Sequence, residues 1–271
     1  MGPIGVFDSG YGGLTILSDI RKRLPEYDYL YLGDNARAPY GTRSFDVVYD
    51  YTLQAVNELF DRGCELVVLA CNTSSAKALR TIQQKDLDRF DSRKRVLGVI
   101  RPSSEIIGQF SKTNNIGVLA TPGTVASKSY EIEISKFSPQ CKIYQHACST
   151  WVTLIESNEH ETEAGMGIIR QDVEMLMSMN DSIDTIVLGC THYPVVKKYI
   201  ESIVPNSVQV IAQGKIVADS LADYLIRHPW MEESCTKGGL VQFLTTESSE
   251  EFDKNASKYI EVVVDSLHIL L

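Results

Sequence analysis

The chain has 271 residues, of which 44% are hydrophobic and 23% charged, a balance typical of folded globular proteins and not of disordered chains. Its 35 acidic residues outnumber the 26 lysines and arginines, and the formal charge of −9 excludes nucleic acid as a main partner because the molecule repels polyanions. No run of about 18 apolar residues and no signal-peptide pattern is present, so we expect a cytoplasmic protein with no membrane partner.

Short apolar runs rich in Val, Ile and Tyr alternate with longer segments whose apolar residues recur at helical spacing. This alternation predicts right-handed β-α-β units, and therefore mostly parallel sheets covered by helices on both faces. In chain order the predicted strands are residues 4–8, 29–33, 66–70, 96–100, 116–120, 142–146, 185–189, 208–212 and 240–244. The predicted helices are residues 13–24, 45–62, 73–83, 103–110, 124–137, 162–179, 195–203 and 216–227.

An internal repeat divides the chain. "IGVFDSGYGG" begins at Ile4 and "IGVLATPGTV" at Ile116, an offset of 116 − 4 = 112, while "VVLACNT" and "IVLGCTH" place Cys71 and Cys190 at an offset of 190 − 71 = 119. The alternative is chance similarity, since Val and Ile are expected in any buried strand. The nearly equal offsets favour two similar parallel-sheet α/β domains with the active site in the cleft between them. The predicted domains are residues 1–98 plus 207–271, and residues 99–206.

The six cysteines predict free thiols. They include no Cys-x-x-Cys, and His146-x-Cys148 and Cys190-x-His192 are isolated pairs, so we expect neither a disulfide framework nor a four-ligand zinc site.

Cys71 and Cys190 each follow a predicted strand, at the edge of an open α/β sheet where ligands bind. A thiol at a helix N-terminus has a lowered pKa and can act as a base, and His192 can exchange a proton near neutral pH. A lone cysteine at such a place is more often a packed thiol. Two cysteines in equivalent positions of two domains instead favour catalysis from two sides of one ligand.

Polar residues accompany both cysteines. The loop that contains Asp8 and Ser9 can hold an anion through backbone N–H groups, although it lacks the third glycine of a dinucleotide fingerprint. Asp8 suits either a helix cap or the orientation of an ammonium group or a thiol. The segment with Tyr40 and Gly41 is typical of a turn and can also contact a small ligand. Asn72, Thr73 and Thr191 suit either helix capping or ligand binding.

With these segments the chain resembles the glutamate racemases, cofactor-independent members of the aspartate/glutamate racemase superfamily. The matching segments run over nearly the whole chain: "GVFDSGYGGL", "YLGDNARAPYGTRS", "LVVLACNTSSAKAL", "LGVI", "IGVLATPGTV", "IVLGCTHYP" and "FLTTES". The resemblance implies an isomerase that interconverts L- and D-glutamate by a two-cysteine mechanism with no cofactor and no metal. It also implies a supply of D-glutamate for peptidoglycan synthesis, cell wall biogenesis and cell shape. The chain is compatible with a homodimer, and the sequence does not decide the oligomeric state.

The resemblance also assigns residue roles. Cys71 and Cys190 are the catalytic acid/base groups, with Asp8 assisting the first and His192 with Glu156 assisting the second. The chain departs from the family pattern at Arg101, around Glu156 in "STWVTLIES", and in "AQG" at residues 212–214. The substrate-binding residues would be Asp8, Ser9, Tyr40, Gly41, Asn72, Thr73, Thr121, Thr191 and His192.

Two other functions stay open. One is an aspartate racemase or another isomerase with two cysteines, and the other is a non-catalytic amino-acid-binding protein with two domains.

Overall fold

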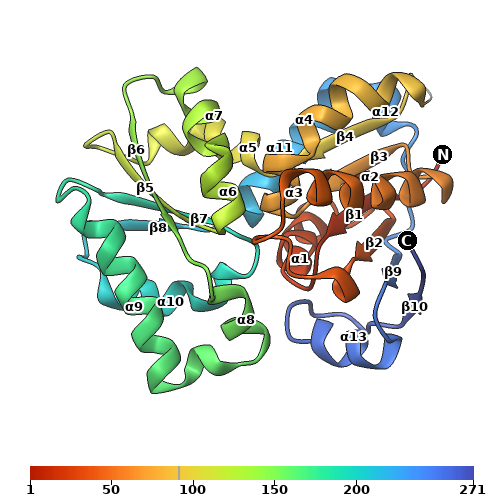
Figure 1. Cartoon of the computed structure of the whole chain (residues 1–271). Helices are drawn as coiled ribbons and strands as arrows, with labels where there is room; N and C mark the ends of the chain where they lie inside the picture. Colours follow the sequence, from red (N-terminus) through yellow and green to blue (C-terminus); the bar gives the residue numbers. More distant parts are fainter. Residues whose placement is uncertain (91) are drawn as a thin grey trace.

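The computed structural model describes residues 1–90 and 92–271 and contains two β-sheets, each packed between helices (Figure 1). The larger sheet lies on the right of Figure 1 with both chain termini, and its strand order is β10-β9-β2-β1-β3-β4, with every neighbouring pair parallel. Its strands are β1 (Ile4–Asp8), β2 (Tyr29–Gly33), β3 (Leu66–Leu69), β4 (Arg95–Gly98), β9 (Val241–Thr245) and β10 (Ser266–His268).

The smaller sheet repeats the centre of the larger one. Its order, β6-β5-β7-β8, matches β2-β1-β3-β4, so β5 is the equivalent of β1 and β7 the equivalent of β3. All its pairs are parallel, and the predicted fold of two similar parallel-sheet α/β units is confirmed. Its strands are β5 (Asn115–Ala120), β6 (Lys142–Ala147), β7 (Thr185–Gly189) and β8 (Gln209–Ile211).

The strand pairing moves one predicted domain boundary. We expected residues 207–271 to return to the first domain, but β8 pairs with β7 and therefore belongs to the smaller sheet. The chain returns to the larger sheet after Ile211, and α11 packs there. The sequence did not decide this boundary, because no Gly/Ser/Pro linker marks it and strand pairing depends on a distant strand.

Alternating apolar side chains explain why helices cover both faces of the larger sheet. On β1, Val6 packs in the same cluster as Leu17 and Leu221, while the next residue, Phe7, packs on the opposite face with Val56. The helices of this half are α1 (Gly13–Arg23), α2 (Phe45–Asp61), α3 (Asn72–Lys77), α4 (Leu79–Thr81), α11 (Gly214–Arg227), α12 (Pro229–Glu232) and α13 (Ser249–Ala256). Those of the other half are α5 (Ile100–Ile106), α6 (Pro122–Ser127), α7 (Ser129–Phe137), α8 (Trp151–Glu156), α9 (Glu163–Ser178) and α10 (Lys197–Ile203). Single turns complete the fold: η1 (Asn35–Arg37), η2 (Ile82–Asp86), η3 (Leu87–Arg89), η4 (Ile107–Gln109), η5 (Glu159–Glu161) and η6 (Tyr193–Val196).

Most predicted elements are present, with local differences. The predicted helix over residues 124–137 is two helices, because Lys128 adopts a left-handed conformation (φ 55°) between α6 and α7. The strand predicted over residues 96–100 ends at Gly98, and Ile100 begins α5. The sequence did not indicate α8, α12, α13 or β10, which are too short for a clear apolar period. Among the described residues, no helix is both long and apolar enough to cross a membrane.

Candidate active site

The candidate site is a pocket at the carboxyl ends of the two central strands of each sheet. Ser9 follows β1, Cys71 follows β3, Thr121 follows β5 and Cys190 follows β7, and all four residues line this one pocket. Because β1 and β3 belong to one half of the molecule and β5 and β7 to the other, the pocket lies between the two halves.

Most of the predicted site residues meet there. Asp8 lies behind the pocket wall, 1% exposed, and its Oδ2 accepts a hydrogen bond from the backbone of Gly10 at 2.9 Å. Four further lining residues were not predicted as site residues: Gly10, Ala38, Pro39 and Val152. Gly10 and Pro39 adjoin predicted residues, Ala38 lies two residues before Tyr40, and Val152 belongs to the unpredicted α8. The predicted residues that line the pocket are Ser9, Tyr40, Gly41, Cys71, Asn72, Thr73, Thr121, Glu156, Cys190, Thr191 and His192.

A helix begins after Cys71 as predicted, but its N-cap is Cys71 itself and not Asn72 or Thr73, the capping candidates of the sequence. Cys71 Sγ lies 3.4 Å from the backbone N of Ser74, which donates to it, and 3.4 Å from Ser9 Oγ. Burial and then the negative charge of Asp8 nevertheless raise the pKa of the Cys71 thiol to about 11. The expected lowering by the helix N-terminus is therefore wrong here, because a short helix end does not offset the loss of solvent. Cys71 is a neutral thiol at pH 7 in the free protein.

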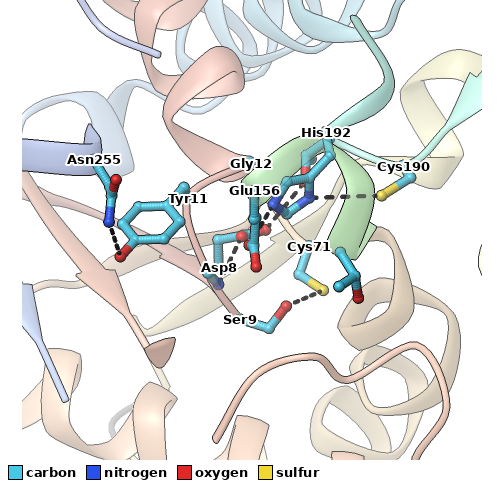
Figure 2. Close-up of polar contacts among 12 residues, drawn as sticks. Asp8, Ser9, Tyr11, Gly12, Cys71, Glu156, Cys190, His192 and Asn255 are labelled. Atoms are coloured by element: carbon cyan, nitrogen blue, oxygen red, sulfur yellow. Dashed lines mark hydrogen bonds and ion pairs between the residues drawn. The ribbon is translucent and has the colours of Figure 1, made fainter. Parts of the chain in front are cut away.

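Cys190 has a different partner. It precedes η6, a 3-10 helix that runs directly into α10, so the helix end on this side of the pocket is a 3-10 turn and not an α-helix. His192 Nδ1 lies 3.8 Å from Cys190 Sγ, and His192 Nε2 lies 2.8 Å from Glu156 Oε1. Figure 2 shows the imidazole between the thiol and the carboxylate. Burial opposes a charge on His192, but the hydrogen bonds to Cys190 and Glu156 outweigh it and raise the pKa of His192 to about 10. The imidazole is therefore protonated at neutral pH.

Asp8 comes from the larger-sheet half of the molecule and makes contacts with residues of the other half. Burial raises the pKa of its carboxyl above the ordinary value, while the positive charge of His192 opposes this effect. Thr191 Oγ1, from the other half of the molecule, donates to Asp8 Oδ1 at 3.4 Å.

The Asn72 side chain is held by two residues from distant parts of the chain. Its Oδ1 accepts from the hydroxyl of Tyr130 on α7 at 2.7 Å, and its Nδ2 donates to Gln213 Oε1 at 2.8 Å. The adjacent Thr73 lies with its Oγ1 3.0 Å from Thr121 Oγ1. The sequence marked residues 212–214 only as a departure from the family pattern, and Gln213, 2% exposed, is a supporting residue that it did not predict.

Two glycines permit close approach across the pocket. A Cβ on Gly12 would lie 2.4 Å from Thr191 Oγ1 and 2.5 Å from His192 Nδ1. A Cβ on Gly41 would lie 2.8 Å from Thr121 Cβ. These positions therefore need glycine for the two halves to meet.

Tyr40 and Arg101 do not direct polar groups into the pocket. The Tyr40 side chain lines the pocket, but its hydroxyl donates to the buried Asp34 carboxylate and not toward the pocket. Arg101 lies outside the pocket lining, exposed on α5, with its Nε 2.9 Å from Glu105 Oε1. The departure from the family pattern at Arg101 therefore lies outside the pocket wall.

This geometry of two thiols, an imidazole and two carboxyl groups around one pocket suits proton transfer to and from carbon. The sequence matches the model of a protein family described as Asp/Glu/Hydantoin racemase over residues 15–221. The chain belongs to this racemase family. It is therefore an isomerase, as the resemblance implied.

Individual racemases agree with the family match. The chain is 39% identical over 267 residues to the glutamate racemase of Roseobacter denitrificans, covering 95% of this chain and 96% of that protein. The structure of a glutamate racemase isoform from Bacillus anthracis matches with a TM-score of 0.90 and 31% identity, covering 100% of this chain and 98% of that one. A Francisella tularensis glutamate racemase in complex with D-glutamate matches with a TM-score of 0.86 and 30% identity, covering 99% and 97%.

Proposed function

We propose that this racemase interconverts L- and D-glutamate and that Cys71 and Cys190 are its two acid/base groups. The observation that carries the proposal is that the two cysteines follow equivalent strands, β3 and β7, of two similar halves and line one pocket. The glutamate racemases that the chain resembles over nearly their full length, one of them with D-glutamate bound, support glutamate as the substrate.

Racemisation needs proton transfer on two sides of Cα. A thiolate on one side takes the α-proton, the C–H electron pair stays on carbon as a carbanion delocalised into the carboxylate, and a thiol on the other side returns a proton. After one turnover, the first cysteine carries the proton and the second has lost one. The reverse reaction exchanges their tasks, which explains why similar halves supply similar groups.

The surroundings of each thiol suit this exchange. Cys71 is a neutral thiol near pH 7 and is ready to donate its proton, with Ser9 in contact and Asp8 behind it. On the other side, the protonated His192 lies against Cys190 Sγ and is held by Glu156, so it can pass a proton to the sulfur and, once neutral, take one back.

The remaining polar lining binds the substrate in this proposal. The side chains of Ser9, Asn72, Thr73, Thr121 and Thr191 offer hydroxyl and amide groups to the carboxylates and the ammonium group of glutamate. Tyr40 and Gly41 shape the wall, since the Tyr40 hydroxyl is already bonded to Asp34. In a site with little water these donors also stabilise the charge that develops on the substrate carboxylate.

We place the enzyme in the cytoplasm, where it supplies D-glutamate for peptidoglycan synthesis. The six cysteines of the chain are all free in the structure, and two catalytic thiols suit a reducing compartment. Bacterial cells depleted of this protein should therefore grow again when D-glutamate is added to the medium, and failure of this rescue would contradict the cellular role.

The activity is tested by incubating the purified protein with L-glutamate, without added cofactor, and separating the enantiomers on a chiral column. We expect D-glutamate to form and the protein to lack an absorbance band of a pyridoxal cofactor. Aspartate is the comparison substrate. A higher kcat/KM for aspartate than for glutamate would move the assignment to an aspartate racemase.

The two-base mechanism is tested by isotope exchange in D2O. The proton returned to Cα comes from a thiol equilibrated with solvent, so early D-glutamate should carry deuterium at Cα while the remaining L-glutamate stays largely unlabelled. The reverse reaction should behave alike. Mass spectrometry of the separated enantiomers measures this, and D product that keeps its original α-hydrogen would rule out transfer from opposite sides.

A further inference from the structure

A second set of reactive side chains lies outside the pocket, in the half built on the smaller sheet. His146 is near the end of β6, Cys148 follows that strand, and Asp172 projects from α9, which packs on β6. One donor atom from each of the three residues lies within 4.8 Å of the other two. Across residues 1–90 and 92–271, this is the one such group of three His, Cys, Asp or Glu side chains. The sequence showed only the isolated His146-x-Cys148 pair; the fold adds the carboxylate.

The donor set selects a class of cation. Imidazole nitrogen, thiolate sulfur and carboxylate oxygen together suit zinc and cobalt, whereas magnesium and calcium prefer oxygen ligands alone. Donor atoms around a tetrahedral zinc ion lie roughly 3.5 Å apart. His146 Nε2 and Asp172 Oδ1 are already 2.8 Å apart, so a small movement of the side chains is enough to enclose an ion.

The proposed reaction uses none of these three side chains. His146 and Asp172 are partly exposed, 16% and 18%, and the Cys148 thiol is buried beside them. The thiol makes a long contact, 4.0 Å, with the backbone carbonyl of His146, and the Tyr193 hydroxyl also lies near it. Burial raises the pKa of Cys148 strongly, so without a cation the sulfur keeps its proton.

We propose that His146 Nε2, Cys148 Sγ and a carboxylate oxygen of Asp172 bind a divalent cation of the zinc type, and that binding lowers racemisation. Water completes the four-coordinate site. On binding, Cys148 releases its proton to solvent and the cation replaces the hydrogen bond between His146 and Asp172. Cation binding does not depend on the proposed racemase activity. The predicted loss of activity on cation binding rests on that proposed function.

The coupling to the pocket runs through α8. Asp172 Oδ2 accepts from Trp151 Nε1 at 2.7 Å, and Trp151 is the first residue of α8, the helix that places Val152 and Glu156 in the pocket wall. The Trp151 ring also packs on Tyr193, with centroids 4.7 Å apart. A cation that draws Asp172 toward Cys148 weakens its bond to Trp151 and so alters the support of Glu156.

Tyr193 provides a second connection between the proposed cation site and the pocket. Its hydroxyl donates to the Cys148 carbonyl at 3.2 Å, and it directly follows His192 in the chain. A shift of Cys148 toward a cation is therefore transmitted to the imidazole that contacts Cys190.

Binding is tested with cobalt(II), whose bond to a thiolate gives a charge-transfer band in the near ultraviolet. The titration uses protein with Cys71→Ser and Cys190→Ser, so that the pocket thiols cannot produce the band. We expect saturation at one cobalt per chain and competition by zinc. Cys148→Ser should abolish the band, and Asp172→Asn should weaken affinity at least tenfold. Cys141→Ser, a half-buried cysteine of the same half, is the matched control and should leave the band unchanged.

Activity is measured separately with wild-type cysteines in the pocket. Zinc should lower the kcat of the wild-type enzyme, and Cys148→Ser should require at least tenfold more zinc for the same loss while keeping the activity without zinc. A cobalt band that survives Cys148→Ser, or no band at all, would overturn the site even if the protein is an active racemase. Equal zinc sensitivity in both proteins would overturn the coupling to α8.

Discussion

Cys71 and Cys190 line one pocket in different electrostatic surroundings. Cys71 is buried near the carboxylate of Asp8, whereas Cys190 contacts an imidazole that hydrogen bonds to Cys190 and Glu156 keep protonated. At the scale of single residues, the two halves are thus alike in the position of the sulfur atom but not in what surrounds it. Each thiol needs its own test.

Replacing either cysteine by serine should nearly abolish racemisation. A hydroxyl of similar size cannot become a base near neutral pH, and losing an acid/base group costs on the order of 10²–10⁴ in rate. Chiral chromatography measures the loss in Cys71→Ser and Cys190→Ser, and circular dichroism should show an intact fold. Cys141→Ser, which lies outside the pocket lining, is the control with full activity. Wild-type rates in either pocket variant would remove that cysteine from the mechanism.

Glu156→Gln should change the pH dependence of the reaction. Glu156 helps to hold the pKa of His192 near 10, so the imidazolium is present below that pH and is lost above it. Without the carboxylate this pKa falls, and the alkaline limb of kcat/KM should move to lower pH. Glu159→Gln, an exposed neighbour on η5, is the matched control. If the alkaline limb of the kcat/KM profile stays at the same pH in Glu156→Gln, the contact between Glu156 and His192 does not set the pH dependence of the reaction.

At the scale of elements, the start of α11 joins two other helices near the pocket. Gln213 precedes α11 and accepts from Asn72 on α3, while its Nε2 donates to the Val99 carbonyl at 3.1 Å and to Ser103 Oγ on α5 at 2.8 Å. One buried amide thereby fixes the orientation of the Asn72 side chain in the pocket wall.

Gln213→Ala should therefore affect both stability and substrate binding. Buried groups that lose their partners cost about 1–3 kcal/mol each, and a loosened Asn72 should raise the KM for glutamate. Urea denaturation and steady-state kinetics measure the two effects. Gln209→Ala, exposed on β8, should change stability by less than about 0.5 kcal/mol. An unchanged KM in Gln213→Ala would mean that Asn72 keeps its orientation without this support.

At the scale of the whole molecule, the pocket depends on how closely the two halves approach. The backbone N of Gly123, from one half, donates to the Gly41 carbonyl of the other at 2.8 Å, next to the contact between Thr73 and Thr121. These contacts place the ends of β3 and β5 side by side, so an obstacle there should separate the halves.

Gly41→Ala provides such an obstacle, since its Cβ would lie 2.8 Å from Thr121 Cβ. A shift of the halves by about 1 Å misplaces the thiols, and we expect kcat/KM to fall on the order of 10²-fold. Gly167→Ala, where an added Cβ on α9 meets nothing within 4 Å, should keep activity and can add up to about 1 kcal/mol of stability. Similar kinetics for the two variants would contradict the role of this close approach.

The sequence by itself determined the kinds of elements, their repetition and the residues at the strand ends. Apolar alternation is a local property, so β1, β2 and β7 match their predicted bounds, and Cys71 and Cys190 follow strands as expected. Family motifs added Glu156, which no local pattern marks and which the structure places against His192.

Only the tertiary structure decided the properties that depend on distant groups. Gln213 meets Asn72 across 141 residues of sequence, and Asp172 reaches His146 from another element. The high pKa of Cys71 follows from burial and from Asp8, neither of which a strand-end motif reveals. Local sequence encodes backbone preference and apolar pattern, whereas solvation, charge and hydrogen-bond partners arise only when separate segments pack together.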